Sequence, residues 1–338
     1  MSFFESNIRH LGGLLSTYQL TGDILFLQKA ETVAKVLEFS FGTVTQQEEN
    51  HGLPYAKLNL QKGYAINNGW ARYCFVLAEF GTIALEWSTL AAETGEKRYM
   101  DYVTTLNNYL RDMAPPESGA WSNSYNGNTM TPCTRAASFG GPGDSFYEYI
   151  LKFYLLSGRK DQKQLDWLKN TTTMIKGSLL YRQDNEKVPV MMVELDSRGN
   201  QIHKMGHLAC FSGGFWILGS SVLPDEMEEN VEIAEGVTQS CHESYVASAT
   251  GIGPEAFDKN GQPIKNAAYY ILRPETIESY FYMYRLTKDN KYRDWAWEFV
   301  LALEKSCRAP FGYAGLKDVN TGEKNDAQES FFLAETLK

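Results

Sequence analysis

The segment "PETIESYFYMYRLTKDNKYRDWAWEFVLALEK", residues 274–305, contains one complete unit of the predicted fold. Its first half is rich in apolar and aromatic residues, its second half carries more charge, and a short polar turn at 286–289 separates the two. A helix that is apolar on most sides belongs inside a protein, whereas a helix with one apolar face lies at the surface. The segment therefore predicts a helical hairpin with a buried first helix and a more exposed second helix.

Similar turns recur along the 338 residues. "LTGD" (20–23), "ETGE" (93–96) and "LSGR" (156–159) each follow an apolar helical stretch, and a weaker turn lies near 223–225. The spacing is roughly 65 residues, which is typical of a repeated helix pair. We predict an all-α fold, a toroidal α/α barrel of inner and outer helices, as a single domain over residues 1–338. Alternating residues around a polar turn predict one small β-hairpin at 188–205.

Composition excludes several classes of protein. A net charge of −9 argues against nucleic-acid binding, which needs basic surfaces. No run of about 18 apolar residues is present, so we expect no membrane-spanning helix in this sequence. The five cysteines lack CxxC spacing, which makes a zinc site improbable and leaves open whether any pair forms a disulfide.

Acidic residues recur at the starts of the predicted inner helices. They are Glu5, Glu79, Asp144 with Glu148, Glu275 with Glu278, and Glu329 with Glu335. Acids three or four residues apart share one helix face, and parallel inner helices would bring all of them to one end of the barrel. Helix capping explains an acid in a first turn. It does not explain why Glu148, Glu278 and Glu335 lie among aromatic and apolar residues, where a charge is costly.

Converging carboxylates with aromatic and arginine neighbours suit glycoside hydrolysis. One carboxylic acid protonates the leaving oxygen and a second carboxylate activates water. Arg9 and Arg273 are placed to orient these acids, and aromatic rings can hold a sugar. His207 begins an inner helix, so both a structural role and a contact with substrate or water remain open.

Several motifs carry a resemblance to a known family. "FESNIRHLGG" (4–13), "LAEFGT" (77–82), "GDSFYEY" (143–149), "HLACFSGG" (207–214), "GIGPE" (251–255), "LRPETIES" (272–279) and "ESFFLAETLK" (329–338) resemble the class I α-1,2-mannosidases of glycosyl hydrolase family 47. The resemblance covers essentially the whole chain. It implies an (α/α)7 barrel and a calcium-dependent, inverting enzyme that removes α-1,2-linked mannose from high-mannose N-glycans.

The same resemblance assigns roles to individual residues. Glu5 and Asp144 are alternative candidates for the acid, and Glu275 is the candidate base. The residues implied to line the pocket and contact sugar are Arg9, Glu79, Glu148, His207, Glu255, Arg273, Glu278, Phe331 and Glu335. Cys210 and Cys241 correspond to the family's disulfide.

The resemblance also sets expectations about location and completeness. It implies a monomer in the lumen of the Golgi or endoplasmic reticulum, or a secreted protein, with a parent that could be membrane-anchored through a segment before residue 1. We expect the barrel to be truncated at both ends, with about one helix pair missing before residue 1. The family's directly calcium-ligating threonine would lie beyond residue 338, so we assign no metal ligand here and expect this chain alone to bind calcium poorly and to lack activity. Pro142 in "GGPGDS" replaces an arginine of the endoplasmic-reticulum type, which favours the Golgi and fungal type.

Two other functions compete with this interpretation. One is a glycan-binding lectin of glycoprotein quality control, related to the degradation-enhancing mannosidase-like proteins. The cysteine pair Cys210 and Cys241 and the intact "LRPETIES" favour the enzyme. The other is a different α/α-barrel glycosidase or a purely structural helical repeat, for which the aligned acids would have to be coincidental.

Overall fold

The computed structural model describes residues 1–42, 51–113, 119–183 and 187–338. These residues form two compact units. Unit 1 comprises Met1–Ala137, Ser145–Met174 and Ser197–Gly199, and unit 2 comprises Ser138–Asp144, Ile175–Asp196 and Asn200–Lys338. Each unit is described by itself below, and a single domain over residues 1–338 stays a prediction.

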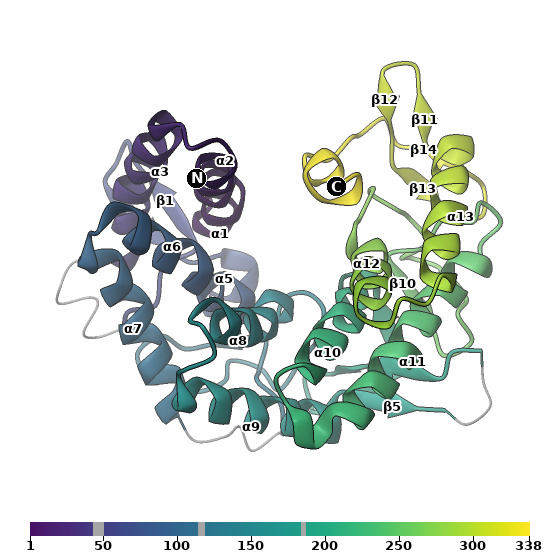
Figure 1. Cartoon of the computed structure of the whole chain (residues 1–338), viewed down its shortest axis with the longest axis horizontal. Helices are drawn as coiled ribbons and strands as arrows, with labels where there is room; N and C mark the ends of the chain where they lie inside the picture. The colour runs from purple at the N-terminus through teal and green to yellow at the C-terminus, as the bar shows by residue number, and fades with distance from the viewer. Residues whose placement is uncertain (43–50, 114–118, 184–186) are drawn as a thin grey trace. The chain divides into compact units, whose positions relative to one another are not determined.

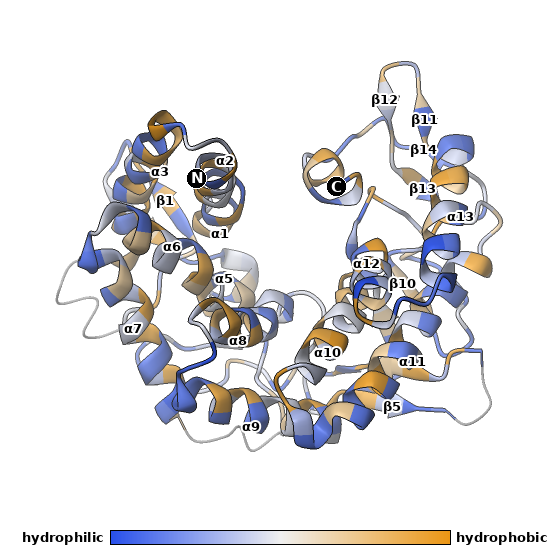
Figure 2. Cartoon of the chain, viewed as in Figure 1, coloured by the Kyte–Doolittle hydropathy of each residue, from blue (hydrophilic) through white to orange (hydrophobic). Residues whose placement is uncertain are grey.

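Helical hairpins dominate unit 1 (Figure 1). The pairs are α2 (Gly12–Thr21) with α3 (Ile24–Leu37), α6 (Ala84–Thr94) with α7 (Lys97–Asp112), and α8 (Asp144–Leu156) with α9 (Gln162–Ser178), the last pair lying almost wholly in this unit. Figure 2 shows hydrophobic and hydrophilic residues alternating along α9, as expected for a helix with one apolar face. The predicted helix pairs are therefore present.

The polar turns between paired helices contain a residue in the left-handed conformation, which ends the first helix. Gly22 (φ 70°) and Gly95 (φ 74°) end α2 and α6, and their N–H groups donate to Tyr18 O and Ala91 O. This conformation satisfies carbonyl groups that a helix end otherwise leaves without partners, and glycine adopts it without steric cost. Asp23 then caps the next helix, since its Oδ1 accepts from the Leu25 N–H at 2.9 Å. The repeated turn sequence thus encodes one helix stop and one helix start.

Unit 2 contains α10 (Ser212–Ser220), α11 (Met227–Val246), α12 (Glu275–Thr287) and α13 (Lys291–Ser306). Helix α10 packs against α11 and α12, and α12 packs against α13. Ser279 of α12 donates to Cys210 O at 2.5 Å and accepts from the Gly214 N–H at 3.0 Å. These bonds hold the starts of α10 and α12 side by side.

Burial of the first helices is less uniform than predicted. Helix α10 is buried along most of its length. Helix α12 buries only the face formed by Thr276, Ser279, Tyr280 and Met283, and the ring of Phe281 is 55% exposed. This buried face contacts α10, α11, α13, the helical turn η4 (His207–Phe211) and the turn η6 (Phe332–Thr336).

Short antiparallel strand pairs, most of them hairpins, lie between the helices. In unit 1, β1 (Lys57–Asn59) pairs with β2 (Tyr64–Ile66) and β3 (Phe75–Val76) with β4 (Ser124–Tyr125). In unit 2, β11 (Arg308–Ala309) pairs with β12 (Gly312–Tyr313) and β13 (Leu316–Asp318) with β14 (Glu323–Lys324). The chain therefore has more hairpins than the one that we predicted.

The predicted hairpin at 188–205 is present only around its turn. Strand β7 (Glu194–Leu195) pairs with β8 (Gln201–Ile202) across a turn in which the Asp196 N–H donates to Asn200 O at 2.8 Å. On either side, β6 (Val190–Met192) pairs with β5 (Leu180–Arg182), and β9 (Lys204–Gly206) pairs with β10 (Ala256–Asp258). Strands from elsewhere in the sequence thus replace the outer half of the expected ladder.

Two disulfides stabilise the chain. Cys210–Cys241, which the resemblance implied, links η4 to α11. Cys74–Cys133 was not predicted and joins the segments next to β3 and β4. Cys307 is free and buried. Within the described ranges, no helix is both long and apolar enough to cross a membrane.

Close packing at Gly213 gives a direct test of the unit 2 core. A Cβ at this position would lie 2.2 Å from Thr238 Oγ1 and 2.8 Å from Ser279 Oγ, so Gly213→Ala forces these side chains to move. We expect a loss of about 1–3 kcal/mol in the free energy of unfolding, measured with urea. Gly177→Ala is the matched control, because a Cβ there meets nothing within 4 Å, and it should be neutral or stabilising by up to about 1 kcal/mol. Equal effects of both substitutions would contradict the packing.

Candidate active site

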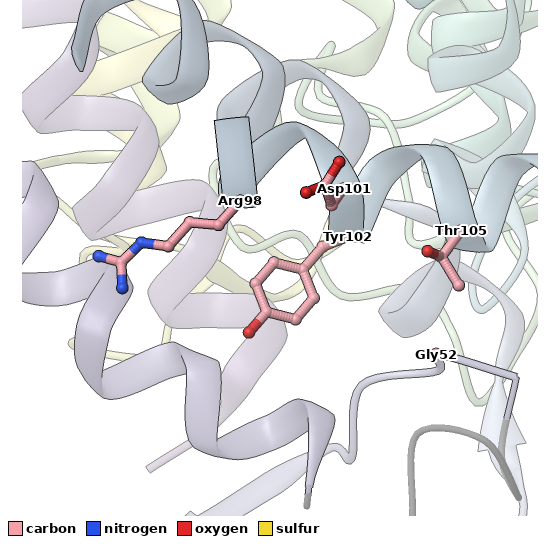
Figure 3. Close-up of a pocket in the computed structure, with 5 residues that line it drawn as sticks. All are labelled: Gly52, Arg98, Asp101, Tyr102 and Thr105. Atoms are coloured by element: carbon pink, nitrogen blue, oxygen red, sulfur yellow. The ribbon is translucent and has the colours of Figure 1, made fainter. Parts of the chain in front are cut away.

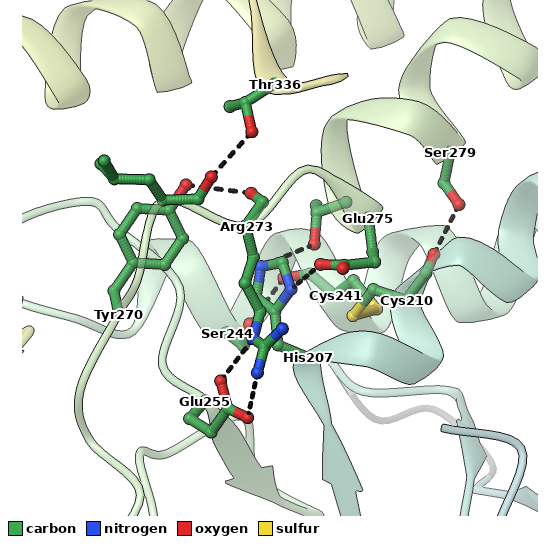
Figure 4. A network of polar contacts seen from close by, with 12 residues as sticks. His207, Cys210, Cys241, Ser244, Glu255, Tyr270, Arg273, Glu275, Ser279 and Thr336 are labelled. Carbon is green, nitrogen blue, oxygen red and sulfur yellow. Dashed lines mark hydrogen bonds and ion pairs between the residues drawn. A yellow bond between two sulfur atoms is a disulfide. The ribbon is translucent and has the colours of Figure 1, made fainter. Parts of the chain in front are cut away.

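His207 lies at the centre of a polar network in unit 2 (Figure 4). Its side chain is 1% exposed, its Nδ1 is 2.7 Å from Glu275 Oε2, and its Nε2 is 2.6 Å from the Tyr245 hydroxyl. A carboxylate only accepts hydrogen bonds, so Nδ1 donates to Glu275 and Nε2 accepts from Tyr245. Burial raises the pKa of Tyr245, which keeps the hydroxyl protonated for this role. The imidazole thereby fixes the orientation of Glu275.

Arg273 and Glu255 form a second pair beside this network. Arg273 Nε is 2.6 Å from Glu255 Oε2, and Nη2 is 2.8 Å from Oε1. Such two-point pairs fix the geometry of both side chains. The Glu255 C=O accepts from the His207 N–H at 2.8 Å, and the Arg273 C=O accepts from the Tyr270 hydroxyl at 3.0 Å. The ion pair and the histidine network therefore share one rigid frame.

Backbone strain lies immediately before Arg273. Leu272 has a φ of 66°, a conformation that costs a side-chain-bearing residue about 1–3 kcal/mol. Its side chain is buried in an apolar cluster with Tyr245 and Phe332, and its C=O accepts from Thr336 Oγ1 at 2.7 Å. Strained residues held by their surroundings cluster at functional sites. The left-handed conformation of Leu272 changes the direction of the main chain just before α12 begins.

Helix α12 begins with the predicted acids. Pro274 is its N-terminal cap residue, and Glu275 and Glu278 lie in its first turn, where acids complement the helix dipole. Near this start, the π-helical turn η6 (Phe332–Thr336) carries Glu335 and is preceded by Phe331. Since Thr336 bonds to Leu272, the structure brings this turn to the loop that carries Arg273.

Unit 1 brings together a second set of predicted residues. Glu5 ends α1 (Phe3–Glu5) and forms an ion pair with Arg9 of the π-helical turn η1 (Ser6–Leu11). Glu79 of α5 (Leu77–Gly81) accepts two hydrogen bonds from Asn68 Nδ2, at 2.9 and 3.1 Å. Burial raises the pKa of Glu79, and the negative charge of Glu5 adds to this. Isolated π-helical turns are frequent at functional sites.

Helix α8 places Asp144 and Glu148 four residues apart, on one face as predicted. Asp144 is its first residue, and the Asp144 N–H donates to Gly140 O at 3.0 Å. Glu148 forms an ion pair with Lys152. The predicted site residues therefore fall into a unit 1 set (Glu5, Arg9, Glu79 and Glu148) and a unit 2 set (Asp144, His207, Glu255, Arg273, Glu275, Glu278, Phe331 and Glu335).

Sequence analysis overlooked Glu86 and Tyr245. Glu86 of α6 is 8% exposed, and burial raises its pKa to about 7. It was overlooked because the predicted helix began at Glu79, which placed Glu86 well inside it, whereas α6 begins at Ala84 and has Glu86 in its first turn. An acid inside the apolar stretch 79–91 is the same signal that singled out Glu148, and it could have identified Glu86. No sequence signal distinguishes Tyr245 from the other tyrosines of the chain.

A cavity of about 230 Å³ lies elsewhere in unit 1 (Figure 3). It is lined by Gly52 and by Arg98, Asp101, Tyr102 and Thr105 of α7. None of the predicted site residues borders it. Arg98 is paired with Glu31 and Glu38, and Asp101 with Lys97. The charged groups of this cavity thus already have partners within the protein.

A calcium site would need several oxygen ligands from the described residues. Calcium takes six to eight oxygen ligands, usually including several carboxylates. In the part of the chain that the structure describes, no group of three or more His, Cys, Asp or Glu side chains is arranged to hold a metal. Glu255 is engaged by Arg273 and Glu275 by His207. These residues alone do not fit a calcium ion, so no chemical step below is assigned to one.

Comparisons with known proteins show the family of the chain. The sequence model of "Glycosyl hydrolase family 47" matches residues 1–338. The chain is 42% identical to mannosyl-oligosaccharide alpha-1,2-mannosidase IA of Drosophila melanogaster, covering 100% of this chain and 50% of that protein. It is 39% identical to mannosyl-oligosaccharide 1,2-alpha-mannosidase IB of Homo sapiens, covering 100% and 53%. The chain thus spans about half the length of the curated relatives it matches.

Solved structures confirm the fold class. The alpha-1,2-mannosidase from Trichoderma reesei matches with a TM-score of 0.86 and 31% identity, over 99% of this chain and 75% of that chain. This match confirms the predicted all-α fold of the (α/α)7 class. A D-mannose isomerase matches with a TM-score of 0.70 at 13% identity, over 99% of this chain and 84% of that chain, which shows a shared fold alone.

Glu86 predicts a pH dependence of stability. Its pKa is about 7 in the folded protein against 4.5 as its ordinary value, so between these pH values the unfolded chain loses a proton that the folded chain keeps. The free energy of unfolding therefore falls as pH rises from 4.5 to 7, by about 3 kcal/mol for this group.

Glu86→Gln removes this contribution. We expect the difference in unfolding free energy between wild type and variant to change by about 3 kcal/mol between pH 4.5 and pH 8, measured by urea denaturation. Glu93→Gln, near the end of the same helix and partly exposed, is the control for removal of a carboxylate. A difference that stays constant for Glu86→Gln would show that this carboxyl does not titrate as described.

Proposed function

Because the chain belongs to glycosyl hydrolase family 47, we propose that the protein removes terminal α-1,2-linked mannose from high-mannose N-glycans, with inversion at the anomeric carbon. The observation that carries the proposal is the pair of contacts His207–Glu275 and Arg273–Glu255 on one rigid frame. These contacts provide an oriented carboxylate beside an arginine that is fixed in place. The printed activities of the mannosidase relatives supply the substrate class.

Glu275 is the proposed base. The bond from His207 engages its Oε2, so Oε1 can accept a proton from the attacking water. The water oxygen bonds to the anomeric carbon as the glycosidic C–O bond breaks, and the leaving oxygen takes a proton from the acid. Glu5, acting through a water, and Asp144 are the two candidates for that acid. His207 and Tyr245 keep their protons throughout this scheme. Their role is to position the base.

The remaining site residues are proposed to bind sugar. Arg273 offers a guanidinium whose direction is fixed by Glu255, and Phe331 offers an aromatic face. Glu79, whose carboxyl is oriented by Asn68, can accept a hydrogen bond from a sugar hydroxyl. The same sugar-binding role is proposed for Arg9, Glu148, Glu255, Glu278 and Glu335. His207 is buried with both ring nitrogens engaged, so its proposed role is to position Glu275 rather than to contact sugar.

The proposed setting is the lumen of the secretory pathway, the Golgi or endoplasmic reticulum, or the extracellular space. Disulfides form and persist in oxidising compartments, and this chain has two. A monomeric state and a membrane-anchored parent are part of the same proposal and follow from the resemblance alone.

Glu275→Gln tests the base. The amide cannot take a proton from water, so mannose release should fall by at least about 100-fold. Glycan affinity, measured by calorimetry on the same variant, should stay within a few-fold of wild type because the side chain keeps its shape. Glu298→Gln on the exposed part of α13 is the control and should release mannose at the wild-type rate.

Two results would redirect this assignment. Near-normal turnover by Glu275→Gln means that another residue is the base. A wild-type protein that binds the glycan and releases no mannose, with calcium supplied, would support the lectin function instead.

Calcium dependence is a separate part of the proposal. A chelator added to the full-length protein should abolish mannose release, and added calcium should restore it. The unfolding temperature should rise with calcium concentration, because a ligand that binds only the folded state stabilises it. Undiminished release at saturating chelator would refute a calcium requirement.

A further inference from the structure

A buried polar network in unit 1 begins at Asn7. Its side-chain Nδ2 donates to Thr82 O at 2.9 Å and to Glu86 Oε2 at 3.2 Å, while its Oδ1 accepts from Trp87 Nε1 at 2.9 Å. Asn7 is fully buried, and these three bonds use both of its amide hydrogens and its oxygen. The π-helical turn η1 is therefore attached to α6 through this one side chain.

Glu86 extends the network to α8. Its Oε1 accepts from the Tyr149 hydroxyl at 2.6 Å, and its Oε2 accepts from Asn7. A Cβ at Gly12 would lie 3.6 Å from both Cγ and Oε1 of Glu86, so the main chain at the start of α2 closes over the carboxyl. One carboxyl group of α6 thus contacts three other helical segments, η1, α2 and α8.

A second link joins the same segments. Thr82, in the connection between α5 and α6, accepts from Asn7 through its C=O and donates through Oγ1 to Ser145 Oγ at 2.7 Å. Ser145 lies in the first turn of α8. Tyr149 and Ser145 lie one helical turn apart on α8. Tyr149 bonds to Glu86 of α6, and Ser145 bonds to Thr82 just before α6.

The segments joined in this way carry the unit 1 site residues. Asn7 stands midway between Glu5 and Arg9, Tyr149 directly follows Glu148, and Thr82 comes three residues after Glu79. A shift of any of these segments relative to the others would move the acidic side chains apart. The bonds of Glu86 go to Asn7 and Tyr149 rather than to a candidate acid or base, so its effect on the reaction is exerted through position.

A purely structural purpose does not explain the choice of residue. A buried carboxyl is costly, and apolar side chains of similar size often stabilise a core better. The raised pKa of Glu86 reflects that cost. The carboxyl does, however, supply two acceptor oxygens at fixed positions, which an apolar side chain cannot.

We propose that Glu86 is a positioning residue of the hydrolase, whose carboxyl, bonded to Asn7 and Tyr149, sets the spacing of Glu5, Arg9 and Glu148. This inference rests on the proposed function, since those residues act on the glycan only if that function is right. It assigns Glu86 no contact with substrate.

The test compares three substitutions in the full-length protein. Glu86→Gln replaces one acceptor oxygen with an amide donor, which either opposes Asn7 Nδ2 or reverses the bond to Tyr149, and Tyr149→Phe removes the bond to Oε1. We expect kcat/KM for mannose release to fall about 10- to 100-fold in the first and about 5- to 20-fold in the second, since small displacements of catalytic groups have effects of this size. Tyr154→Phe is the control, because this hydroxyl bonds to Arg159 O at the far end of α8. It should change kcat/KM less than twofold.

A double variant separates positioning from general destabilisation. If Glu86 and Tyr149 act through their shared bond, Glu86→Gln with Tyr149→Phe should lose no more activity than the more impaired single variant. Unfolding midpoints should show that every variant is folded at the assay temperature. Single variants within twofold of wild type would overturn the proposal. So would losses that multiply in the double variant and track the loss of stability.

Failure of the proposed function gives a different result. If the wild-type protein binds the glycan and releases no mannose, the hydrolase is wrong, and the positioning role is then read from glycan affinity. The role predicts that Glu86→Gln and Tyr149→Phe weaken binding at least about fivefold relative to Tyr154→Phe. Unchanged affinity in all three variants would overturn it.

Discussion

The hydrogen bond between His207 Nδ1 and Glu275 joins two helix starts that are 68 residues apart in the sequence. The other arrangements of unit 2 around it can be understood as support for this contact. The Cys210–Cys241 disulfide and the bond from Ser279 to Cys210 O fix the turn that follows His207. The strained Leu272, held by Thr336, directs Arg273 and Glu275 into place. A carboxylate so constrained is already oriented before substrate arrives.

The acidic residues of unit 1 are also held in place by buried polar side chains, but these are of other types. The helices of this unit are joined by the amide of Asn7 and the carboxyl of Glu86. In both units, the groups that hold the site are buried more deeply than the groups proposed to act on sugar. His207, Asn7 and Glu86 are buried, whereas the Glu5 and Arg9 side chains are 48% and 35% exposed. Buried partners can fix exposed ones because burial removes the competition from water.

Local features of the fold could be predicted from the sequence. The glycine turns, the capping aspartates and the paired helices follow from residues within a few positions of one another, and the structure contains them. The β-hairpin at 188–205 was predicted correctly at its turn and wrongly at its ends, because β6 pairs with the preceding strand β5 and β9 pairs with the distant strand β10. The Cys74–Cys133 disulfide was missed for the same reason, as its cysteines are 59 residues apart.

The candidate site shows a similar division. Periodic acids at helix starts identified Glu5, Glu79, Glu148 and Glu275 from pattern alone, and the resemblance added Glu255. The side chain that orients each acid could not be predicted. The partner of Glu275, for example, depends on how η4 packs against α12. Glu86 escaped because its importance comes from contacts with α8 and η1 rather than from its place in its own helix.

The central claim is that Glu275 activates a water that attacks the anomeric carbon directly. The most direct measurement is proton NMR of the mannose released in the first minutes of the reaction, before the free sugar equilibrates between its anomers. Single displacement at an α-linkage predicts that β-mannose appears first and α-mannose only later. Initial release of α-mannose would contradict the account, because it requires a covalent intermediate and a nucleophilic rather than a basic carboxylate.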